Sequence, residues 1–219
     1  MLTIKNIITP TSVIENYGFT FFESPCKKLG IVTINKCLST SIIKWCTDNK
    51  WMSIEAKKDD NKHKFIVVLR DPIERWISGF RTYMKINNID IRKIEENYWK
   101  IFKQVVIFDT HTLQQYKHLI EINLKNIVPI DFNKNTTSKD FMEILKRYKY
   151  DCILPNLNVR NEQEQIDDNF LKLIIDNDER FLKNLYKVYT NDYWLRYHLL
   201  KKDVPKLLWE DTKDLNVNN

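Results

Sequence analysis

Glycine and proline are scarce in this chain: it has three glycines among 219 residues, and its six prolines are spread thinly. No Gly/Ser-rich or Pro-rich stretch interrupts it, so a flexible linker between domains is excluded and one domain over residues 1–219 is predicted. A Walker A phosphate loop is excluded as well, because GxxxxGK[ST] is absent and no glycine occurs between Gly30 and Gly79.

Cysteine pairs and long apolar runs are also missing. The chain's four cysteines form no CxxC motif and show no His/Cys ligand spacing, so we expect free thiols, a reducing compartment and no metal site. Residues 1–19 lack the apolar core of a signal peptide, and no window reaches the length of a membrane span. These absences predict a soluble, cytoplasmic protein without a membrane partner.

The charge is mildly basic, with 35 Lys and Arg against 29 Asp and Glu, or +6 overall. This excess suits an anionic ligand, and it is too dispersed to predict a nucleic-acid partner. A solvated surface that happens to be basic accounts for it equally well. The hydrophobic fraction of 43% and aromatic fraction of 12% indicate a folded chain.

Strand and helix patterns alternate along the chain. Apolar runs predict strands at 29–34, 64–69 and 126–132. Helical spacing of apolar residues predicts helices at 39–49, 72–85, 91–106, 138–148, 163–176 and 178–200. The expected fold is α/β, with a short central parallel sheet flanked by helices and a helix-rich C-terminal half. We expect a core at about 29–132 and a helical part at about 138–205.

The first strand ends in "NKCLSTSI", where a lysine and three hydroxyls precede a helix. A helix N-terminus attracts anions through its free N–H groups and its dipole. Lys36 adds a full positive charge, and Ser39, Thr40 and Ser41 add hydroxyl donors. This pattern predicts a phosphate-like ligand. An alternative is that Ser39 or Thr40 caps the helix while Lys36 is solvated.

The second strand ends in "VVLRDPIERWISGF". Arg70 stands at the strand end, and a helix from Pro72 places Arg75 and Ser78 on one face. Arg70 can bind a phosphate through two parallel hydrogen bonds, and Ser78 can add a third. Ligands bind beyond the carboxyl ends of parallel strands, so two anion sites are predicted at neighbouring strand ends. An Arg–Asp structural pair is the alternative.

These two segments resemble motifs of the sulfotransferases that use 3'-phosphoadenosine 5'-phosphosulfate (PAPS). "NKCLSTSI" is similar to their 5'-phosphosulfate loop, although family members often carry a glycine or another small residue where Leu38 stands. "LRDPIERWISGF" is similar to their 3'-phosphate motif, Arg-Asp-Pro-x-x-Arg-x-x-Ser-x-[Tyr/Phe]. "FDTHTLQQY" resembles the Asp-x-His-x-x-Pro-Gln segment of the carbohydrate branch, with Gln114 in place of the proline. "LPNLNVRNE" and "LYKVYTNDYWLRYHL" extend the resemblance over most of residues 29–200.

The resemblance implies a P-loop-like three-layer fold and PAPS as co-substrate, with adenosine 3',5'-bisphosphate as product and no metal. Arg70 and Ser78 would bind the 3'-phosphate. Lys36 would act in catalysis, at the bridging oxygen or the 5'-phosphate. The remaining residues that would bind the donor form the loop and the helix start: Cys37, Leu38, Ser39, Thr40 and Ser41.

A general base must accept the proton of the acceptor hydroxyl. His111 is the first candidate, from the Asp-x-His segment and the ordinary pKa of histidine. His63 and Glu55 are rivals, since related enzymes often place the base between the two phosphate motifs. Asp109 could orient His111 or cap a turn. The other two histidines, His118 and His198, are assigned to structural or solvated positions.

The implied acceptor is a hydroxyl, on a glycan in the favoured reading. The lysine-rich segments 57–64 and 201–206 could line an acceptor site or be ordinary loops. Aromatic rings that could stack on a sugar or an adenine are Trp51, Trp76, Tyr98 and Trp99. The sequence leaves the oligomeric state open. The membrane anchor common among animal carbohydrate sulfotransferases is missing, which suits either a microbial or viral setting or a shortened chain.

Three other functional classes stay open. A P-loop-like nucleotide kinase would need a Walker A turn and an acid that binds magnesium. A non-catalytic basic binding module would need basic and aromatic residues interleaved on one surface. The third is a sulfotransferase fold that binds nucleotide without turnover.

Overall fold

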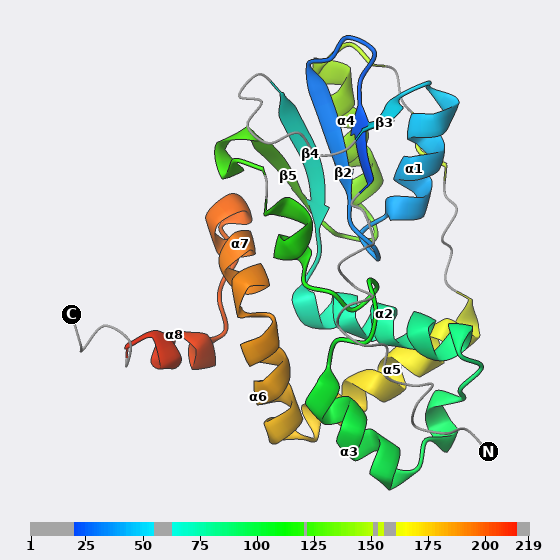
Figure 1. Cartoon of the computed structure of the whole chain (residues 1–219), viewed down its shortest axis with the longest axis vertical. Coiled ribbons are helices and arrows are strands. Elements are labelled where there is room, and N and C mark those ends of the chain that lie inside the picture. Colours follow the sequence, from blue (N-terminus) through cyan, green and yellow to red (C-terminus); the bar gives the residue numbers. More distant parts are fainter. Residues whose placement is uncertain (1–19, 55–62, 121, 151–152, 156–160, 214–219) are drawn as a thin grey trace. The chain divides into compact units, whose positions relative to one another are not determined.

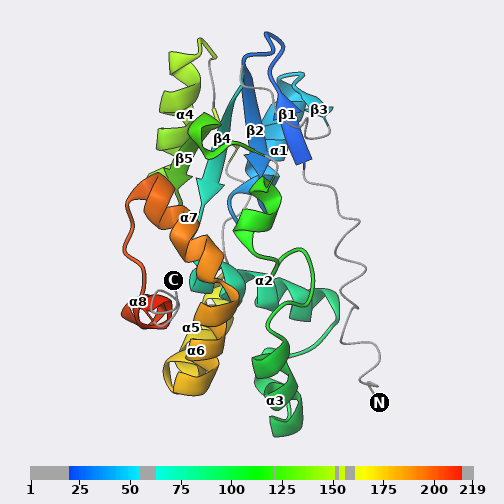
Figure 2. The same cartoon turned by 60° about the vertical axis from the view of Figure 1, so that its left-hand side comes forward.

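The computed structural model describes residues 20–54, 63–120, 122–150, 153–155 and 161–213 (Figures 1 and 2). These residues form two compact units, each built from separate stretches of chain. The sheet unit comprises the described residues of 15–71 and 115–159, and the helical unit those of 72–114 and 160–219. The sequence predicts one domain over residues 1–219, with a core at about 29–132 and a helical part at about 138–205. That the two units belong to one domain stays a prediction.

The sheet unit contains a mixed sheet in the order β3-β1-β2-β4-β5. Its strands are β1 (Thr20–Glu23), β2 (Leu29–Thr33), β3 (Met52–Ile54), β4 (Lys64–Leu69) and β5 (Ile127–Asp131). Strands β2, β4 and β5 are parallel neighbours, whereas β1 runs antiparallel to both β2 and β3. The α/β class is therefore confirmed, and the sheet is not parallel throughout.

The two antiparallel strands escaped prediction because their sequence signal is weak. Every residue of β2 is buried, and the last four residues of β4 are buried too, so both read as continuous apolar runs. Strand β3 has three residues, of which Met52 and Ser53 are exposed. So short and exposed a strand has no periodicity to detect, and its pairing with β1 depends on tertiary contacts.

Helices α1 (Ser39–Asp48) and α4 (Thr137–Arg147) belong to the sheet unit, which also has 3₁₀ turns at Gln115–Leu119 and Leu124–Asn126. The rings of Trp45 and Phe141 meet edge to face with centroids 6.2 Å apart, so the two helices cover the same face of the sheet. The three-layer arrangement stays a prediction.

The helical unit is built from helices and a 3₁₀ turn. They are α2 (Pro72–Ile86), the 3₁₀ turn Ile91–Lys93, α3 (Glu96–Val105), α5 (Glu162–Asp176), α6 (Glu179–Val188), α7 (Thr190–Leu200) and α8 (Lys206–Lys213). The helix predicted over 178–200 is two helices, because Tyr189 leaves the helical conformation and is fully buried. The segment 91–106 is likewise divided, and α8 was not predicted.

Aromatic side chains from several helices form the core of this unit. Trp76 and Phe80 stack with centroids 4.8 Å apart, and Phe80 also packs on Phe102 and Phe108. Trp76 Nε1 donates a hydrogen bond to the carbonyl of Val106 at 2.8 Å, so its one polar atom is satisfied. In the part of the chain that the structure describes, every helix falls short of the length and apolar character that crossing a membrane requires.

Candidate functional site

The loop between β2 and α1 has an unusual backbone. Lys36 and Leu38 both take left-handed conformations, with φ of 68° and 64°, and Cys37 between them does not. Alternation of this kind turns successive N–H groups toward one side, which makes a concave anion-binding site. A left-handed residue that is not glycine costs about 1–2 kcal/mol. Leu38 therefore occupies a position that favours glycine by its conformation.

The hydroxyls that follow do not cap the helix. Leu38 is the N-cap residue of α1 and makes no side-chain cap hydrogen bond, so Ser39 and Thr40 lie inside the helix and not at its cap position. The capping alternative for Ser39 and Thr40 is therefore wrong. Ser41 is buried (1% exposed), and its Oγ has no hydrogen-bond partner among the described residues. A buried hydroxyl without a protein partner is rare in folded proteins.

The two predicted junctions meet at the carboxyl edge of the sheet. Because β2 and β4 are adjacent and parallel, Lys36 and Arg70 follow neighbouring strand ends. Arg70 Nη1 lies 3.4 Å from the carbonyl oxygen of Lys36, to which it donates. The Arg70 guanidinium also lies over the ring of Phe132, with Cζ 4.7 Å from the centroid. The arginine is thus held beside the loop.

Gln115 supports both junctions, although no role was predicted for it. It is fully buried; its Oε1 accepts from the N–H of Arg70 at 2.9 Å, and its Nε2 donates to the carbonyl of Arg70 at 2.8 Å. The thiol of Cys37 donates to the same Oε1 at 3.5 Å. The available signal was the glutamine at the end of the Asp-x-His-x-x-Pro-Gln pattern, which falls on Gln115 within "FDTHTLQQY".

Cys37 was predicted to bind the donor, and its groups are engaged within the protein. Its thiol faces Gln115, and its N–H donates to the carbonyl of Ile34 at 3.0 Å. Cys37 therefore shapes the loop.

The structure does not bring His63 together with Lys36 and Arg70. His63 precedes β4 and Arg70 follows it, so the six-residue strand separates them by about 20 Å. His63 Nε2 lies 3.0 Å from Glu23 Oε1 in a nearly buried pair. The predicted role of His63 as base therefore has no support from the geometry of this unit. Its rival Glu55 lies outside the described residues.

The remaining predicted residues belong to the helical unit. Arg75 is fully buried and donates to the carbonyl of Leu113, so it anchors the loop before residue 114 instead of facing a ligand beside Ser78. Ser78 is also buried. His111 Nδ1 lies 2.8 Å from Asp109 Oδ2, and its backbone N–H donates to Asp109 Oδ1 at 2.8 Å. Asp109 thus orients His111 and leaves its Nε2 for other partners.

Gly79, in α2, allows the turn that carries His111 to lie against this helix. A Cβ at Gly79 would stand 2.3 Å from the carbonyl oxygen of His111. No larger residue fits there without displacing the backbone, so the glycine permits the turn that carries His111 to pack directly beside Ser78's helix.

The remaining aromatic and histidine residues named in the sequence analysis differ in how far they are buried. Trp51, Trp76 and Trp99 are buried in their units, so they are core residues and not stacking platforms. Tyr98 is half-buried. His118 is buried and His198 is exposed on α7, where its ring lies near Trp194. Of the lysine-rich segments, residues 57–62 lie outside the described part, and Lys201, Lys202 and Lys206 are exposed.

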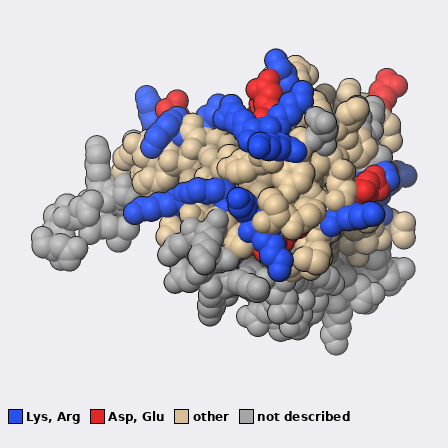
Figure 3. All heavy atoms as spheres, turned by 90° about the horizontal axis from the view of Figure 1, so that it is seen from above, with Lys and Arg blue, Asp and Glu red and all other residues tan. Residues whose placement is uncertain are grey.

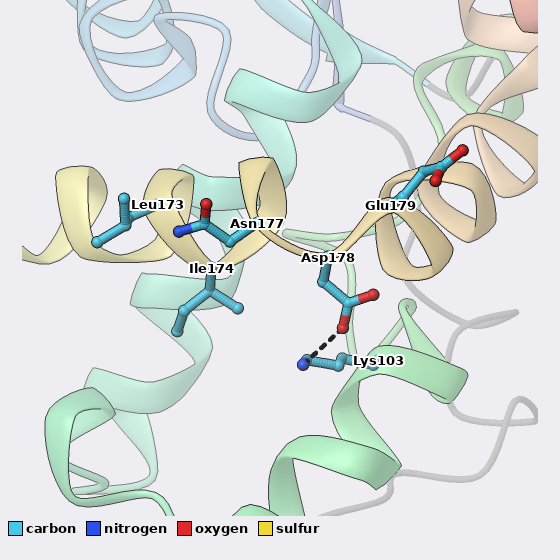
Figure 4. A pocket seen from close by; sticks show the side chains of 6 residues that line it. All are labelled: Lys103, Leu173, Ile174, Asn177, Asp178 and Glu179. Atoms are coloured by element: carbon cyan, nitrogen blue, oxygen red, sulfur yellow. Dashed lines mark hydrogen bonds and ion pairs between the residues drawn. The ribbon is translucent and has the colours of Figure 1, made fainter.

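A hollow of about 420 Å³ on the helical unit is lined by Lys103, Leu173, Ile174, Asn177, Asp178 and Glu179 (Figure 4). Lys103 Nζ donates to Asp178 Oδ2 at 2.7 Å, and this hydrogen bond lowers the pKa of the Asp178 carboxyl. Asp178 Oδ1 also caps α6 by accepting from the N–H of Phe181. Both oxygens serve the fold, and none of the predicted donor or base residues lines the hollow.

Comparison with protein-family models, curated proteins and solved structures finds no match for this chain. The motifs and the geometry of each unit are therefore the basis for assigning a function.

Proposed function

We propose that this protein is a sulfotransferase that moves the sulfuryl group of PAPS to an acceptor hydroxyl, on a carbohydrate. The observation that carries the proposal is that Lys36 and Arg70 lie together at the carboxyl edge of β2 and β4. The carbonyl oxygen of Lys36 is 3.4 Å from Nη1 of Arg70. Their surroundings suit an anion: left-handed backbone in the loop, a helix N-terminus and a buried free hydroxyl at Ser41. The order of strand, loop and helix in the sheet unit also supports a P-loop-like fold as part of this proposal.

The donor carries anionic groups at two separated positions, and the sheet unit offers two cationic groups. The loop amides, Lys36 and the three hydroxyls would hold the 5'-phosphosulfate. Arg70 would bind the 3'-phosphate, which distinguishes PAPS from ordinary nucleotides. Ser78, in the helical unit, stays a predicted partner of that phosphate.

In the transfer step, the acceptor oxygen forms a new bond to sulfur as the bond from sulfur to the bridging phosphate oxygen breaks. Negative charge develops on the bridging oxygen, where the Lys36 ammonium would stabilise it. The acceptor proton passes to the base. His111 stays the predicted base, and its support comes from within its own unit, where Asp109 holds Nδ1 and leaves Nε2 available.

The first test is calorimetric titration with adenosine 3',5'-bisphosphate and, separately, with ATP and magnesium. We expect the bisphosphate to bind and ATP to bind much more weakly. Arg70→Ala should abolish binding of the bisphosphate, whereas Arg180→Ala, which removes an exposed arginine of the helical unit, should leave it unchanged. A preference for ATP with magnesium would favour the kinase alternative, and no nucleotide binding would favour the basic module.

The second test is transfer of labelled sulfate from PAPS to a panel of glycans. His111→Ala should reduce turnover and leave donor affinity unchanged. Equal turnover in this variant would remove His111 as the base. Donor binding without transfer to any acceptor would identify a fold that binds nucleotide and does not turn over.

A further inference from the structure

A cluster of exposed cations occupies the edge of the sheet opposite Lys36 and Arg70. Helices α1 and α4 start at the carboxyl edge and return over about 15 Å, so their ends lie at the amino edge with the starts of β2, β4 and β5. The exposed basic residues of these segments, here called the basic face, are Lys27, Lys28, Lys50, Lys64, Lys125, Lys146, Arg147 and Lys149.

Direct contacts join the segments of the basic face. The backbone N–H of Lys64 donates to the carbonyl of Lys28 at 3.4 Å, and Lys64 Nζ donates to the carbonyl of Lys125 at 2.9 Å. On the other side, Cys26 Sγ lies 3.1 Å from the hydroxyl of Tyr150. The turn before β2 therefore contacts both the start of β4 and the turn after α4, so the cations form one surface.

Acidic side chains do little to neutralise this surface. Among the described residues, no carboxylate forms an ion pair with any member of the basic face. The nearby Asp48 pairs with Lys44 at 3.0 Å, and Glu23 pairs with His63. In the view from above, Lys and Arg side chains gather on the face with few Asp and Glu between them (Figure 3).

Helix dipoles account for part of the cluster. Lys146 and Arg147 lie in the last turn of α4, where cations stabilise the helix C-terminus. Lys28 and Lys64 precede or start strands, and Lys125 lies in a three-residue 3₁₀ turn, so no α-helix end explains these three lysines. Their strands are adjacent, which places the three lysines in a row about 10 Å long.

The composition of the face narrows the class of partner. The exposed aromatic side chains of the described residues, Tyr197 and Trp209, both belong to the helical unit, and the tyrosines within the basic face, Tyr148 and Tyr150, are half-buried. The face therefore offers no fully exposed ring on which nucleobases could stack. Exposed apolar side chains near the face are Met52, on β3, Leu124, before β5, and Ile153, after the turn that follows α4. Met52 and Leu124 belong to opposite edges of the sheet, about 19 Å apart, so these two side chains do not form one apolar patch that could enter a membrane.

We infer that the basic face binds an anionic polysaccharide, holding the polymer on the opposite edge of the sheet from the donor loop. The choice of a polysaccharide among polyanions rests on the proposed function, because a carbohydrate is the proposed acceptor. Lysine ammoniums suit sulfate and carboxylate groups spaced along a flexible chain, since each acts as a point charge without fixed geometry. Affinity should fall steeply with salt.

The test is calorimetric titration of the whole chain with a heparin decasaccharide at several salt concentrations. The triple variant Lys28→Gln, Lys125→Gln and Lys149→Gln removes three cations of the face and spares Lys64, which bonds within the fold. The matched control, Lys100→Gln, Lys172→Gln and Lys206→Gln, removes three exposed lysines of the helical unit. We expect binding about tenfold weaker or more in the face variant, with a shallower salt dependence, and a much smaller change in the control.

Further titrations separate this inference from the proposed function. Adenosine 3',5'-bisphosphate should bind the face variant as it binds the unaltered protein. Equal loss of heparin binding in both triple variants would overturn the basic face as a site. Tighter binding to a DNA oligonucleotide of equal charge, or to vesicles with anionic lipids, than to heparin would overturn the assignment of a polysaccharide as the partner. Heparin binding through the face without nucleotide binding would leave this site standing and remove the sulfotransferase.

Discussion

The side-chain amide of Gln115 pairs with both peptide groups of Arg70, accepting from its N–H at 2.9 Å and donating to its carbonyl at 2.8 Å. Strand β4 ends at Leu69, whose carbonyl still accepts from the N–H of Phe132 in the β5 direction. One residue later, Gln115 supplies the hydrogen bonds that a neighbouring strand would. Arg70 is thereby held in an extended position beside the loop of Lys36.

Replacing this glutamine should destabilise the fold and weaken ligand binding at the proposed donor site. Gln115→Leu leaves a buried N–H and a buried carbonyl of Arg70 without their partner, which should lower the free energy of unfolding by about 2 kcal/mol or more. Affinity for adenosine 3',5'-bisphosphate should fall as well. Urea denaturation and calorimetry measure the two effects. Gln114→Leu, at the half-buried neighbour, should cost less than about 1 kcal/mol; equal effects at both positions would contradict the role of Gln115.

The left-handed conformation of Leu38 predicts an unusual ranking of substitutions. Leu38→Gly should be more stable than Leu38→Ala by about 1 kcal/mol, because alanine keeps the Cβ that disfavours a φ of 64°. At Thr40, inside α1, the ranking should reverse, since glycine weakens a helix. Thermal denaturation of the four variants measures both differences. An alanine variant more stable than the glycine variant at position 38 would show that the loop has another conformation.

Replacing Ser41 should affect protein stability and ligand binding in different ways. Its buried Oγ has no partner among the described residues, so Ser41→Ala should leave the Tm unchanged or raise it. The same change should weaken nucleotide binding by about three- to tenfold, because one hydrogen bond to the bound anion is lost. Calorimetry with adenosine 3',5'-bisphosphate provides the second measurement. A large fall in Tm together with unchanged affinity would assign Ser41 to the fold alone.

Gly79 should tolerate no side chain. Gly79→Ala places a Cβ 2.3 Å from the carbonyl oxygen of His111, which must move, so we expect a loss of about 2 kcal/mol or more in the free energy of unfolding. In most helix interiors the same change stabilises. Hydrogen exchange should show the amide of Thr112 less protected in the variant. A stabilised variant would mean that the turn does not pack on α2 in solution.

The Lys103–Asp178 pair makes a pH-dependent contribution to stability. The hydrogen bond from Lys103 lowers the pKa of Asp178, so the contribution is present above the ordinary Asp pKa of 3.8 and is lost as pH falls through the lower folded value. Asp178→Asn keeps a good N-cap for α6 and removes the charge. It should cost about 0.5–1 kcal/mol at neutral pH and almost nothing at about pH 2. Urea titrations at both pH values measure the difference. The same loss of unfolding free energy at both pH values would show that it comes from the N-cap hydrogen bond and not from the charge.

Much of the fold could be predicted because its signals are local. The buried runs of β2 and β4 and the apolar spacing of α2 each lie within one short segment, and every one formed where the sequence indicated. The position of Lys36 and Arg70 at neighbouring strand ends followed from the rule that consecutive buried strands pair in parallel. The position of the Lys36 loop beside Arg70 was therefore accessible to sequence reasoning.

Other features depend on partners far along the chain. Gln115 is 45 residues from Arg70, and nothing in the segment around it indicates which peptide group it pairs with. The break at Tyr189 similarly reflects its buried hydroxyl, which donates to the carbonyl of Thr112, 77 residues earlier. Helical spacing continues through position 189, so the pattern alone predicts one helix.

The sequence by itself determined the α/β class, the identity of the main strands and helices, and the lysine and arginine that follow two of the strands. Those properties arise from burial and periodicity within single elements, which neighbouring residues encode. The tertiary structure alone decided that Gln115 clamps Arg70, that His63 faces Glu23 at the other edge of the sheet, and that eight cations share one surface. Each of these depends on which distant segments pack together, because a hydrogen bond or a patch of charge needs proximity in space and not in sequence.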